Sequence, residues 1–234
     1  MGDSALVKEL GSQFHEKGVA VSAKINPGGK RSIPTYIKKS STVPKTASFA
    51  FELTNSDVEL KRKNLKWLDR SLPAKKIILS SSVIVTVTDQ SSWITKPHRL
   101  AGMSAFPTLL SQKLIELSTS IHTEQSTVNH SHELFRSIGK EATVVQDRIG
   151  MVMPRILCML INEAAFALTE NIATPQDIDT AMKLGTNYPL GPIEWGARIG
   201  FTNVVAVLDA LYKDLQEDRY RIAPLLKQLA ANIK

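Results

Sequence analysis

The chain has 234 residues, and its composition, 43% hydrophobic and 22% charged, is ordinary for a globular protein. No apolar run reaches the roughly 18 residues of a membrane-spanning helix, and the start lacks the basic-then-apolar pattern of a signal peptide. The single cysteine, Cys158, excludes an intramolecular disulfide and a multi-cysteine metal site, so we expect a cytoplasmic protein without a bound metal.

The net charge of +7 is unevenly distributed. Residues 1–100 hold 17 Lys and Arg against 8 Asp and Glu, whereas residues 101–234 hold 12 against 14. The basic residues are scattered, and no zinc-finger, RNA-binding or basic-zipper signature accompanies them. We therefore expect neither a nucleic-acid nor a membrane partner.

The first half alternates short apolar runs with amphipathic stretches, which predicts a mostly parallel sheet with crossover helices. Residues 26–48 are rich in Gly, Pro, Ser, Thr and Lys, so loops are expected there. The expected helices are 5–17, 57–68 and 130–139, and the expected strands are 19–25, 48–53, 77–87 (at least at its start), 99–105, 113–117 and 143–146.

The second half changes to a helical period, and the boundary falls near 147–150. Thr174-Pro175-Gln176-Asp177 is a strong helix start, with a threonine cap and proline at the first helical position. The segment 189–194, with Gly191 and Pro192, predicts a turn between helices. The expected helices are 151–168, 177–184, 203–215 and 219–228.

Several segments are similar to one known family. DRIGMVMPRILCMLINEAAFAL (147–168), ATPQDIDTAMKLG (173–185) and YPLGPIEW (188–195) resemble the C-terminal domain of L-3-hydroxyacyl-CoA dehydrogenases. RLAGMSAFPTLLSQKLIEL (99–117) resembles the last strands of that family's nucleotide-binding domain, and FELTNSDVELKRKNLKWLD (51–69) resembles its middle. The resemblance is specific in the C-terminal part and weak before about residue 47.

The resemblance implies an α/β domain followed by an all-α domain. Residues 1–147 would form a truncated Rossmann-like parallel sheet, and residues 148–234 a helical, 6-phosphogluconate-dehydrogenase-like domain that commonly dimerises. It also implies NAD as cofactor, an acyl-CoA ligand, and the oxidation of (S)-3-hydroxyacyl-CoA to 3-oxoacyl-CoA in fatty-acid metabolism.

The family's catalytic positions are altered in this sequence. Oxidising a secondary alcohol needs a base for the hydroxyl proton. The family uses a histidine, oriented by a glutamate twelve residues later; Glu116 matches the glutamate, but Ser104 stands at the histidine position. Pro154 aligns with the substrate-binding asparagine. The family's active-site serine aligns without gaps on Val83, and a one-residue shift places Ser82 there instead. If catalysis persists, we expect Glu116 and Ser104 to border the site, with Ser82 as a hydroxyl donor.

The cofactor end departs from the family as well. A dinucleotide fold needs a strand and then G-x-G-x-x-G opening a helix, so that backbone amides meet the pyrophosphate. Here Gly2 is the only surviving glycine, Ser4 stands at the second position, and Asp3 adds negative charge. Lys61 matches a family lysine near the nicotinamide, although a plain exposed helix face is the more common explanation for such a lysine. The expected cofactor contacts are therefore Gly2, Ser4 and Lys61.

Two functions remain open at this point. The chain is either a divergent dehydrogenase that keeps some activity, or a relative that has lost catalysis and NAD binding and serves as a homodimeric binding or structural protein.

Overall fold

In a computed structural model the chain folds as two units, Met1–Met151 and Val152–Lys234. The structure describes residues 1–27, 33–55 and 57–232. The sequence places the boundary slightly earlier, after Asp147. The Asp147 carboxylate accepts hydrogen bonds from the backbone of Val87 at 2.9 Å and of Thr88 at 2.8 Å, which holds this segment in the first unit.

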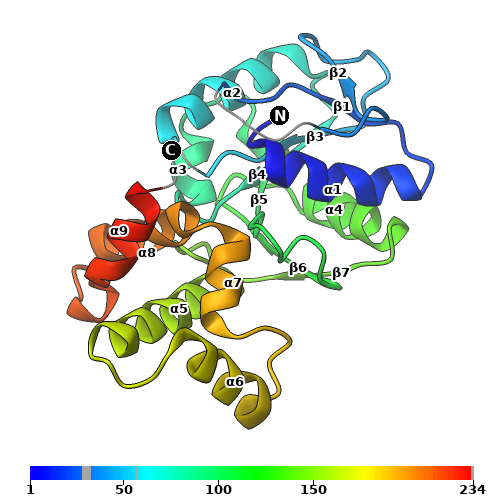
Figure 1. Cartoon of the computed structure of the whole chain (residues 1–234). Helices are drawn as coiled ribbons and strands as arrows, with labels where there is room; N and C mark the ends of the chain where they lie inside the picture. The colour runs from blue at the N-terminus through cyan, green and yellow to red at the C-terminus, as the bar shows by residue number, and fades with distance from the viewer. Residues whose placement is uncertain (28–32, 56, 233–234) are drawn as a thin grey trace. The chain divides into compact units, whose positions relative to one another are not determined.

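A five-stranded sheet organises the first unit (Figure 1). Its strands lie in sequence order, and all pairs are parallel except β5 with β6, which is antiparallel. A second sheet holds two short parallel strands. The strands are β1 (Ser22–Ala23), β2 (Lys38–Lys39), β3 (Phe49–Glu52), β4 (Ile77–Ser81), β5 (Leu100–Met103), β6 (Leu114–Ser118) and β7 (Glu141–Val144).

Met1 to Asp3 lie between the two sheets. Gly2 forms parallel bridges to Ile25 and to Leu53, so this short segment occupies a strand position between β1 and β3. Gly2 has φ +145°, and a Cβ there would lie 2.5 Å from the backbone of Leu53. Only glycine therefore allows this close approach.

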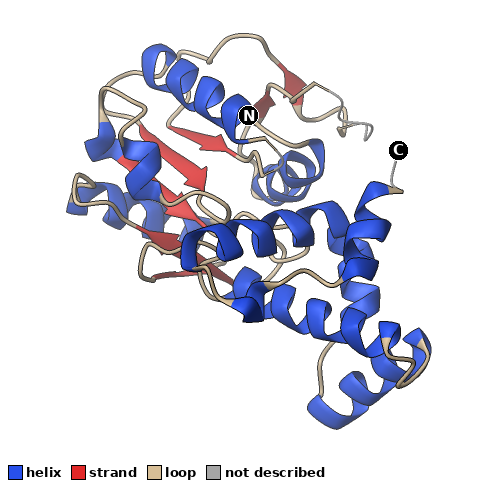
Figure 2. Cartoon of the chain, turned by 90° about the vertical axis from the view of Figure 1, so that its left-hand side faces the viewer, coloured by secondary structure: helices blue, strands red, loops and turns tan. Residues whose placement is uncertain are grey.

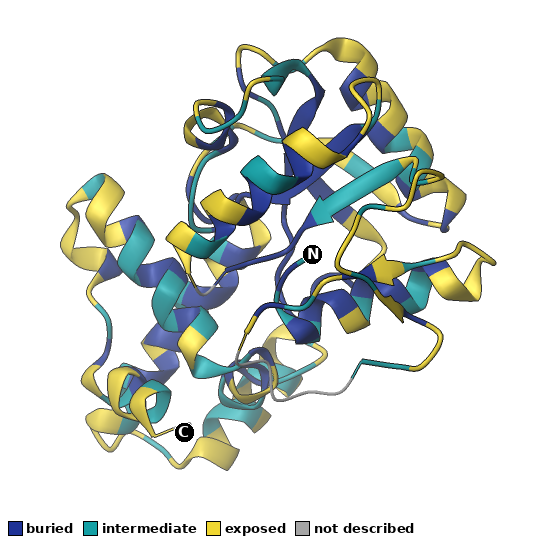
Figure 3. Ribbon diagram, turned by 90° about the horizontal axis from the view of Figure 1, so that it is seen from above, coloured by how far each residue is buried: buried dark blue, intermediate teal, exposed yellow. Residues whose placement is uncertain are grey.

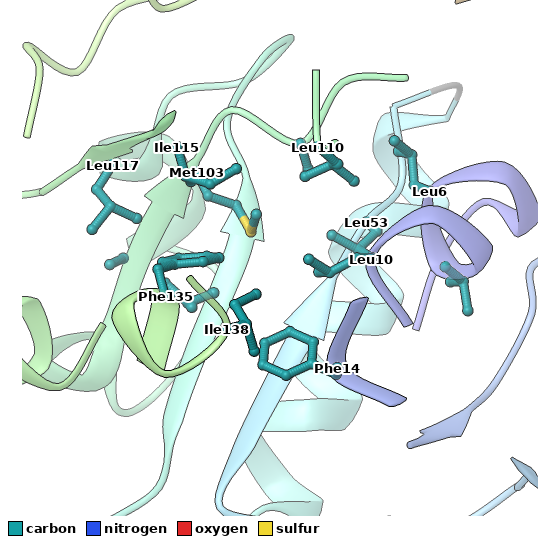
Figure 4. Close-up of a cluster of buried hydrophobic side chains, with 14 of the residues drawn as sticks. Leu6, Leu10, Phe14, Leu53, Met103, Leu110, Ile115, Leu117, Phe135 and Ile138 are labelled. Carbon is teal, nitrogen blue, oxygen red and sulfur yellow. The ribbon is translucent and has the colours of Figure 1, made fainter. Parts of the chain in front are cut away.

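Helices cover both faces of the larger sheet. On one face, α1 (Ser4–Glu16) and α4 (Gln125–Ser137) direct apolar side chains onto the strands (Figure 4). On the other face, α2 (Val58–Ser71) and α3 (Val87–Ser91) pack on Ile78 and Leu100. A short 3-10 helix, η1 (Pro97–Arg99), leads into β5.

The described residues of the second unit form helices joined by loops, with no strand among them (Figure 2). Its helices are α5 (Met153–Thr169), α6 (Pro175–Thr186), α7 (Pro192–Ile199), α8 (Phe201–Leu215), the 3-10 helix η2 (Asp218–Tyr220) and α9 (Pro224–Ala231). Cys158 lies on α5, fully buried, and burial raises the pKa of its thiol above the ordinary range. Among the described residues, no helix is long and apolar enough to cross a membrane.

The expected order of a mostly parallel α/β part and an all-α part is confirmed. Several element boundaries were wrong. The strand expected over 77–87 ends at Ser81, and α3 follows, because the Thr86 hydroxyl accepts a hydrogen bond from the backbone of Asp89 and caps a helix. Strand β2 lies within the segment expected to be loop, part of which falls outside the described residues.

Helix α7 takes up the second half of the turn expected over 189–194, whereas residues 189–191 lie between α6 and α7 as expected. The Asp179 carboxylate on α6 accepts hydrogen bonds from Ile193 at 2.8 Å and from Glu194 at 3.0 Å, which caps α7 from a neighbouring helix. The helix expected over 219–228 is divided into η2 and α9, because Pro224 cannot continue a helix and instead begins one.

Candidate functional site

Ser104 and Glu116 come together at the end of β5. Ser104 follows β5 directly, and the antiparallel strand β6 places Glu116 beside it. The Ser104 hydroxyl oxygen accepts a hydrogen bond from the Glu116 backbone N–H at 3.1 Å, and the Ser104 N–H donates to the Glu116 carbonyl at 2.9 Å. Only 5% of Ser104 and 4% of Glu116 is exposed. The contact between the two residues runs through backbone groups of Glu116.

Ser82 follows β4 and is fully buried against the next two strands. Its hydroxyl lies 3.1 Å from that of Ser118 on β6 and 3.5 Å from the sulfur of Met151. A Cβ at Gly102 of β5 would lie 2.2 Å from the Ser118 hydroxyl and 2.3 Å from that of Ser82. A glycine at position 102 therefore lets the two serines meet across β5.

Asn55 connects the ends of three strands. It follows β3, and its side-chain amide donates to the Ala105 carbonyl at 2.7 Å and accepts from the Ser81 hydroxyl at 2.6 Å. Its backbone N–H donates to the Asp3 carboxylate at 2.9 Å. The carboxyl ends of β3, β4 and β5 therefore share one polar network, at the edge where open α/β sheets bind their ligands.

The expected cofactor residues Gly2 and Ser4 lie at the start of α1. Asp3, between them, is the N-cap residue, and Ser4 begins the helix and is buried. The Asp3 carboxylate also accepts a hydrogen bond from the Asn26 side chain at 2.9 Å. A fixed negative charge thus lies at a helix N-terminus, where the exposed N–H groups would otherwise attract a phosphate.

Lys61 lies on α2 and is fully buried. Its ammonium forms a salt bridge with the equally buried carboxylate of Glu52 on β3 and donates to the Thr54 carbonyl at 3.1 Å. Asn64 extends this cluster to Asn26 through a hydrogen bond of 3.0 Å. Lys61 is therefore not on an exposed helix face: its charge is held by Glu52.

The six predicted site residues form two groups along one edge of the sheet. Ser82 and Ser104 follow the ends of β4 and β5, and Glu116 lies beside them in the middle of β6. Gly2, Ser4 and Lys61 lie around the ends of β1 and β3. Asn55 links the groups, since it contacts both Asp3 and Ala105.

The sequence interpretation missed Asn26, Glu52 and Asn55. Glu52 is the last residue of β3 and Asn55 follows shortly after it, and polar residues at a strand's carboxyl end were the available signal. Among the described residues, no group of three or more His, Cys, Asp and Glu side chains could hold a metal ion.

Sequence comparison matches two family profiles. Residues 150–234 match the 3-hydroxyacyl-CoA dehydrogenase C-terminal domain, and residues 10–148 match the NAD-binding domain of the same family. The second match begins after Gly2 and Ser4, so it does not include the start of α1.

Individual relatives agree with these matches. The chain is 29% identical over 229 residues to a probable 3-hydroxybutyryl-CoA dehydrogenase of Bacillus subtilis, covering 97% of this chain and 78% of that protein. It is 32% identical over 189 residues to a 3-hydroxybutyryl-CoA dehydrogenase of Clostridioides difficile, covering 80% and 67%.

A solved structure supports the same assignment. The (S)-3-hydroxybutyryl-CoA dehydrogenase of Ralstonia eutropha superposes with a TM-score of 0.80 at 26% identity, covering 98% of this chain and 92% of that one. The sheet-then-helices order, the strand-end polar network and both domain matches lead to one conclusion: the chain belongs to the 3-hydroxyacyl-CoA dehydrogenase family.

Proposed function

We propose that the protein keeps the fold of a 3-hydroxyacyl-CoA dehydrogenase but performs the family's oxidation of (S)-3-hydroxyacyl-CoA very slowly or not at all. The environment of Ser104 carries this proposal. An alcohol is far too weak a base to take the substrate's hydroxyl proton at neutral pH, and this hydroxyl oxygen is already an acceptor for the Glu116 backbone. Among the described residues, no histidine side chain hydrogen-bonds to Ser82 or Ser104.

Weakened NAD binding is the second part of the proposal. A pyrophosphate at the start of α1 would meet the Asp3 carboxylate, which is held there by Asn26 and Asn55. Lys61 offers no compensating positive charge, because Glu52 neutralises it. The residues present therefore do not fit a dinucleotide well, and we derive no hydride-transfer step through one.

A homodimeric binding role is the alternative form of the proposal. Val152, Met153 and Ile156 lie on one side of the start of α5, and between 42% and 52% of each is exposed. Apolar side chains grouped in this way favour contact with a second copy. Such a protein would work in the cytoplasm and hold an acyl-CoA ligand without converting it.

The deciding experiment is NADH oxidation with acetoacetyl-CoA, followed at the cofactor's absorbance beside an active family enzyme. Loss of a general base lowers the rate by about a hundredfold to ten-thousandfold, so we expect turnover at least about a hundredfold below the control. Turnover that co-purifies with the protein at a rate near the control would overturn the proposal.

A second experiment distinguishes loss of the general base from loss of cofactor binding. In the variant Ser104→His with Pro154→Asn, recovery of hydride transfer would show that cofactor binding survives and that the base and the substrate-binding amide were what the protein lacked. We expect no recovery, because Asp3 remains at the start of α1. Circular dichroism checks that the variant is folded.

A further inference from the structure

Helix α2 carries a face of positive charge on its outer side. The helices of the first unit bury one side and expose the other (Figure 3), and in α2 the buried side includes Leu65 and Leu68. Successive residues of a helix are about 100° apart, so residues at positions 62, 63, 66 and 70 lie within an arc of about 100° on the opposite side. This basic face of α2 consists of Arg62, Lys63 and Arg70, which are exposed, and Lys66, which is half-buried.

No carboxylate neutralises the basic face among the described residues. The salt bridges of the first unit that the structure describes are buried ones, between Lys61 and Glu52 and between Arg99 and Asp69. In the same part of the chain, neither the four cations of the basic face nor Glu59, in the first turn of α2, forms a salt bridge. The basic face therefore keeps its full positive charge.

The stability of the helix does not explain this face. Positive charge stabilises a helix within its last turn, where Arg70 lies, but Arg62 and Lys63 lie in the second turn. Lys66 is four positions from both Arg62 and Arg70, and like charges at this spacing destabilise a helix. A partner that supplies negative charge would relieve this repulsion.

We propose that the basic face of α2 binds an acidic helix of another protein. Positions four apart are separated by about 6 Å along a helix axis, so carboxylates at the same spacing on a partner helix meet Arg62, Lys66 and Arg70 in turn. Guanidinium groups can form paired hydrogen bonds with carboxylates. Lys75, exposed in the segment after α2, adds a further positive charge beyond the end of the helix.

The surroundings of the basic face favour a protein partner over a nucleic acid or a membrane. Single-stranded nucleic acids stack their bases on free aromatic rings, whereas Trp93 is half-buried and the Arg62 guanidinium lies 5.6 Å from its ring centre. A helix that lies on a membrane inserts large apolar side chains. Within α2, whose residues are all described, the one large apolar side chain that is exposed is Val58, at 40%.

The test uses the full chain and a helical peptide as the probe. The probe is a fluorescein-labelled alanine peptide of about 16 residues with a glutamate at every fourth position, and the control peptide has the same composition with its glutamates two positions apart, on opposite sides of a helix. Fluorescence anisotropy at low salt should show saturable binding of the probe and at least about fivefold weaker binding of the control. Equal affinities, or no binding of either peptide, would overturn the proposal.

A matched pair of variants tests whether the basic face, rather than net charge, binds the probe. Lys66→Gln with Arg70→Gln removes two charges from the face, whereas Lys17→Gln with Lys227→Gln removes two exposed charges elsewhere. We expect the first variant to bind the probe about fivefold more weakly and the second to keep wild-type affinity. Circular dichroism checks that both are folded, and equal weakening in the two variants would contradict the proposal.

Two further probes test the other classes of partner. Pentathymidylate carries as many negative charges as the glutamate peptide, so tighter binding of this oligonucleotide would overturn the proposal in favour of a nucleic acid. Sedimentation with phosphatidylserine vesicles that the peptide does not prevent would overturn it in favour of a membrane. We expect neither result. The basic face contains no residue of the candidate site, so these outcomes are independent of the dehydrogenase assay.

Discussion

Ser104 occupies a position where its residue type decides the chemistry, and its surroundings explain why serine is tolerated there. The side chain is buried at the end of β5 and binds a backbone N–H of β6, so it contributes to the pairing of the two strands. The sequence predicted that Ser104 and Glu116 would be neighbours. It could not predict that the backbone of Glu116 makes the contact, since that depends on the antiparallel register of β5 and β6.

Substitution of Asp3 tests whether its carboxylate weakens NADH binding at the start of α1. In Asp3→Asn the charge at the start of α1 disappears, while an amide remains a good N-cap residue. We expect NADH to bind about tenfold more tightly, a difference of roughly 1.4 kcal/mol, as measured by cofactor fluorescence titration. Asp57→Asn, at the N-cap of α2, is the matched control and should leave NADH affinity unchanged. Equal affinities in wild type and Asp3→Asn would contradict the role given to this carboxylate.

The buried ion pair of Lys61 and Glu52 leads to a second prediction, which concerns stability. Both side chains are fully buried, so removing one leaves the other as an unpaired buried charge. Lys61→Met should therefore lower the free energy of unfolding by about 3–5 kcal/mol, measured by urea denaturation. Adding Glu52→Gln should restore at least half of the loss.

An exposed ion pair provides the control for the stability loss expected in Lys61→Met. Lys183 and Glu194 form a salt bridge in which 39% and 33% of the side chains are exposed. Lys183→Met should cost less than about 1 kcal/mol. If Lys61→Met were equally mild, Lys61 would be acting as an ordinary surface lysine, the interpretation that its sequence context favoured.

At the scale of elements, Arg99 fastens the end of α2 to the start of β5. Its guanidinium donates to the carbonyls of Leu72, Pro73 and Lys76 and to both the carbonyl and the carboxylate of Asp69. A positive charge at the C-terminus of a helix also interacts favourably with its dipole. This buried contact joins a helix to a strand that the sequence separates by about 30 residues.

The Asp69 carboxylate makes the first unit sensitive to acid. Its burial raises its pKa, but hydrogen bonds from Thr95 and Arg99 lower the pKa by more, so the net value lies below the ordinary one. A carboxyl group with a lowered pKa stabilises the folded state above its unfolded pKa of about 3.9 and loses that contribution as pH falls through the folded value.

We therefore expect Asp69→Asn to be less stable than wild type at pH 7 and to lose less stability between about pH 5 and pH 2. Urea midpoints measured across this range give both quantities. Asp209→Asn, which removes an exposed carboxylate paired with Lys213, should follow the wild-type pH curve. Parallel curves for wild type and Asp69→Asn would show that the Arg99 contact does not control acid stability.

The sequence predicted most elements but misplaced those whose ends depend on distant side chains. Helix α1 and strands β4, β5 and β6 carry their own apolar pattern and were expected. Helix α7 is capped by Asp179 of α6, whose carboxylate accepts from Ile193, fourteen residues further along the chain. No local sequence pattern predicts such a cap. The division of the last helix at Pro224 was visible in the sequence and overlooked.

At the scale of the whole molecule, the order of the two units follows from the sequence because hydrophobic period changes near their boundary. The polar network at the carboxyl edge of the sheet, in contrast, could not be predicted from the sequence. Asn55 contacts Ser81, which lies 26 positions further along the chain, and Ala105, which lies 50 positions further. Such pairings can be predicted only when strand order and register are known.

The proposed homodimer is tested by charge at the exposed face of α5. Ile156 is 52% exposed, so Ile156→Glu should leave the folded chain intact while disfavouring an apolar contact. Sedimentation should show a dimer for wild type and a monomer for this variant. Ile172→Glu, at a 69% exposed position outside the helices, should remain dimeric. A monomeric wild type would remove this proposal.

The lone cysteine makes opening of the helical unit measurable by chemical labelling. Cys158 is enclosed on α5, and burial keeps its thiol protonated, so an alkylating reagent reaches it only while the unit is open. The rate of labelling, divided by that of the unfolded chain, then gives the fraction of time the helices spend apart. Because the chain has no second thiol, a mass measurement reads this opening without engineering.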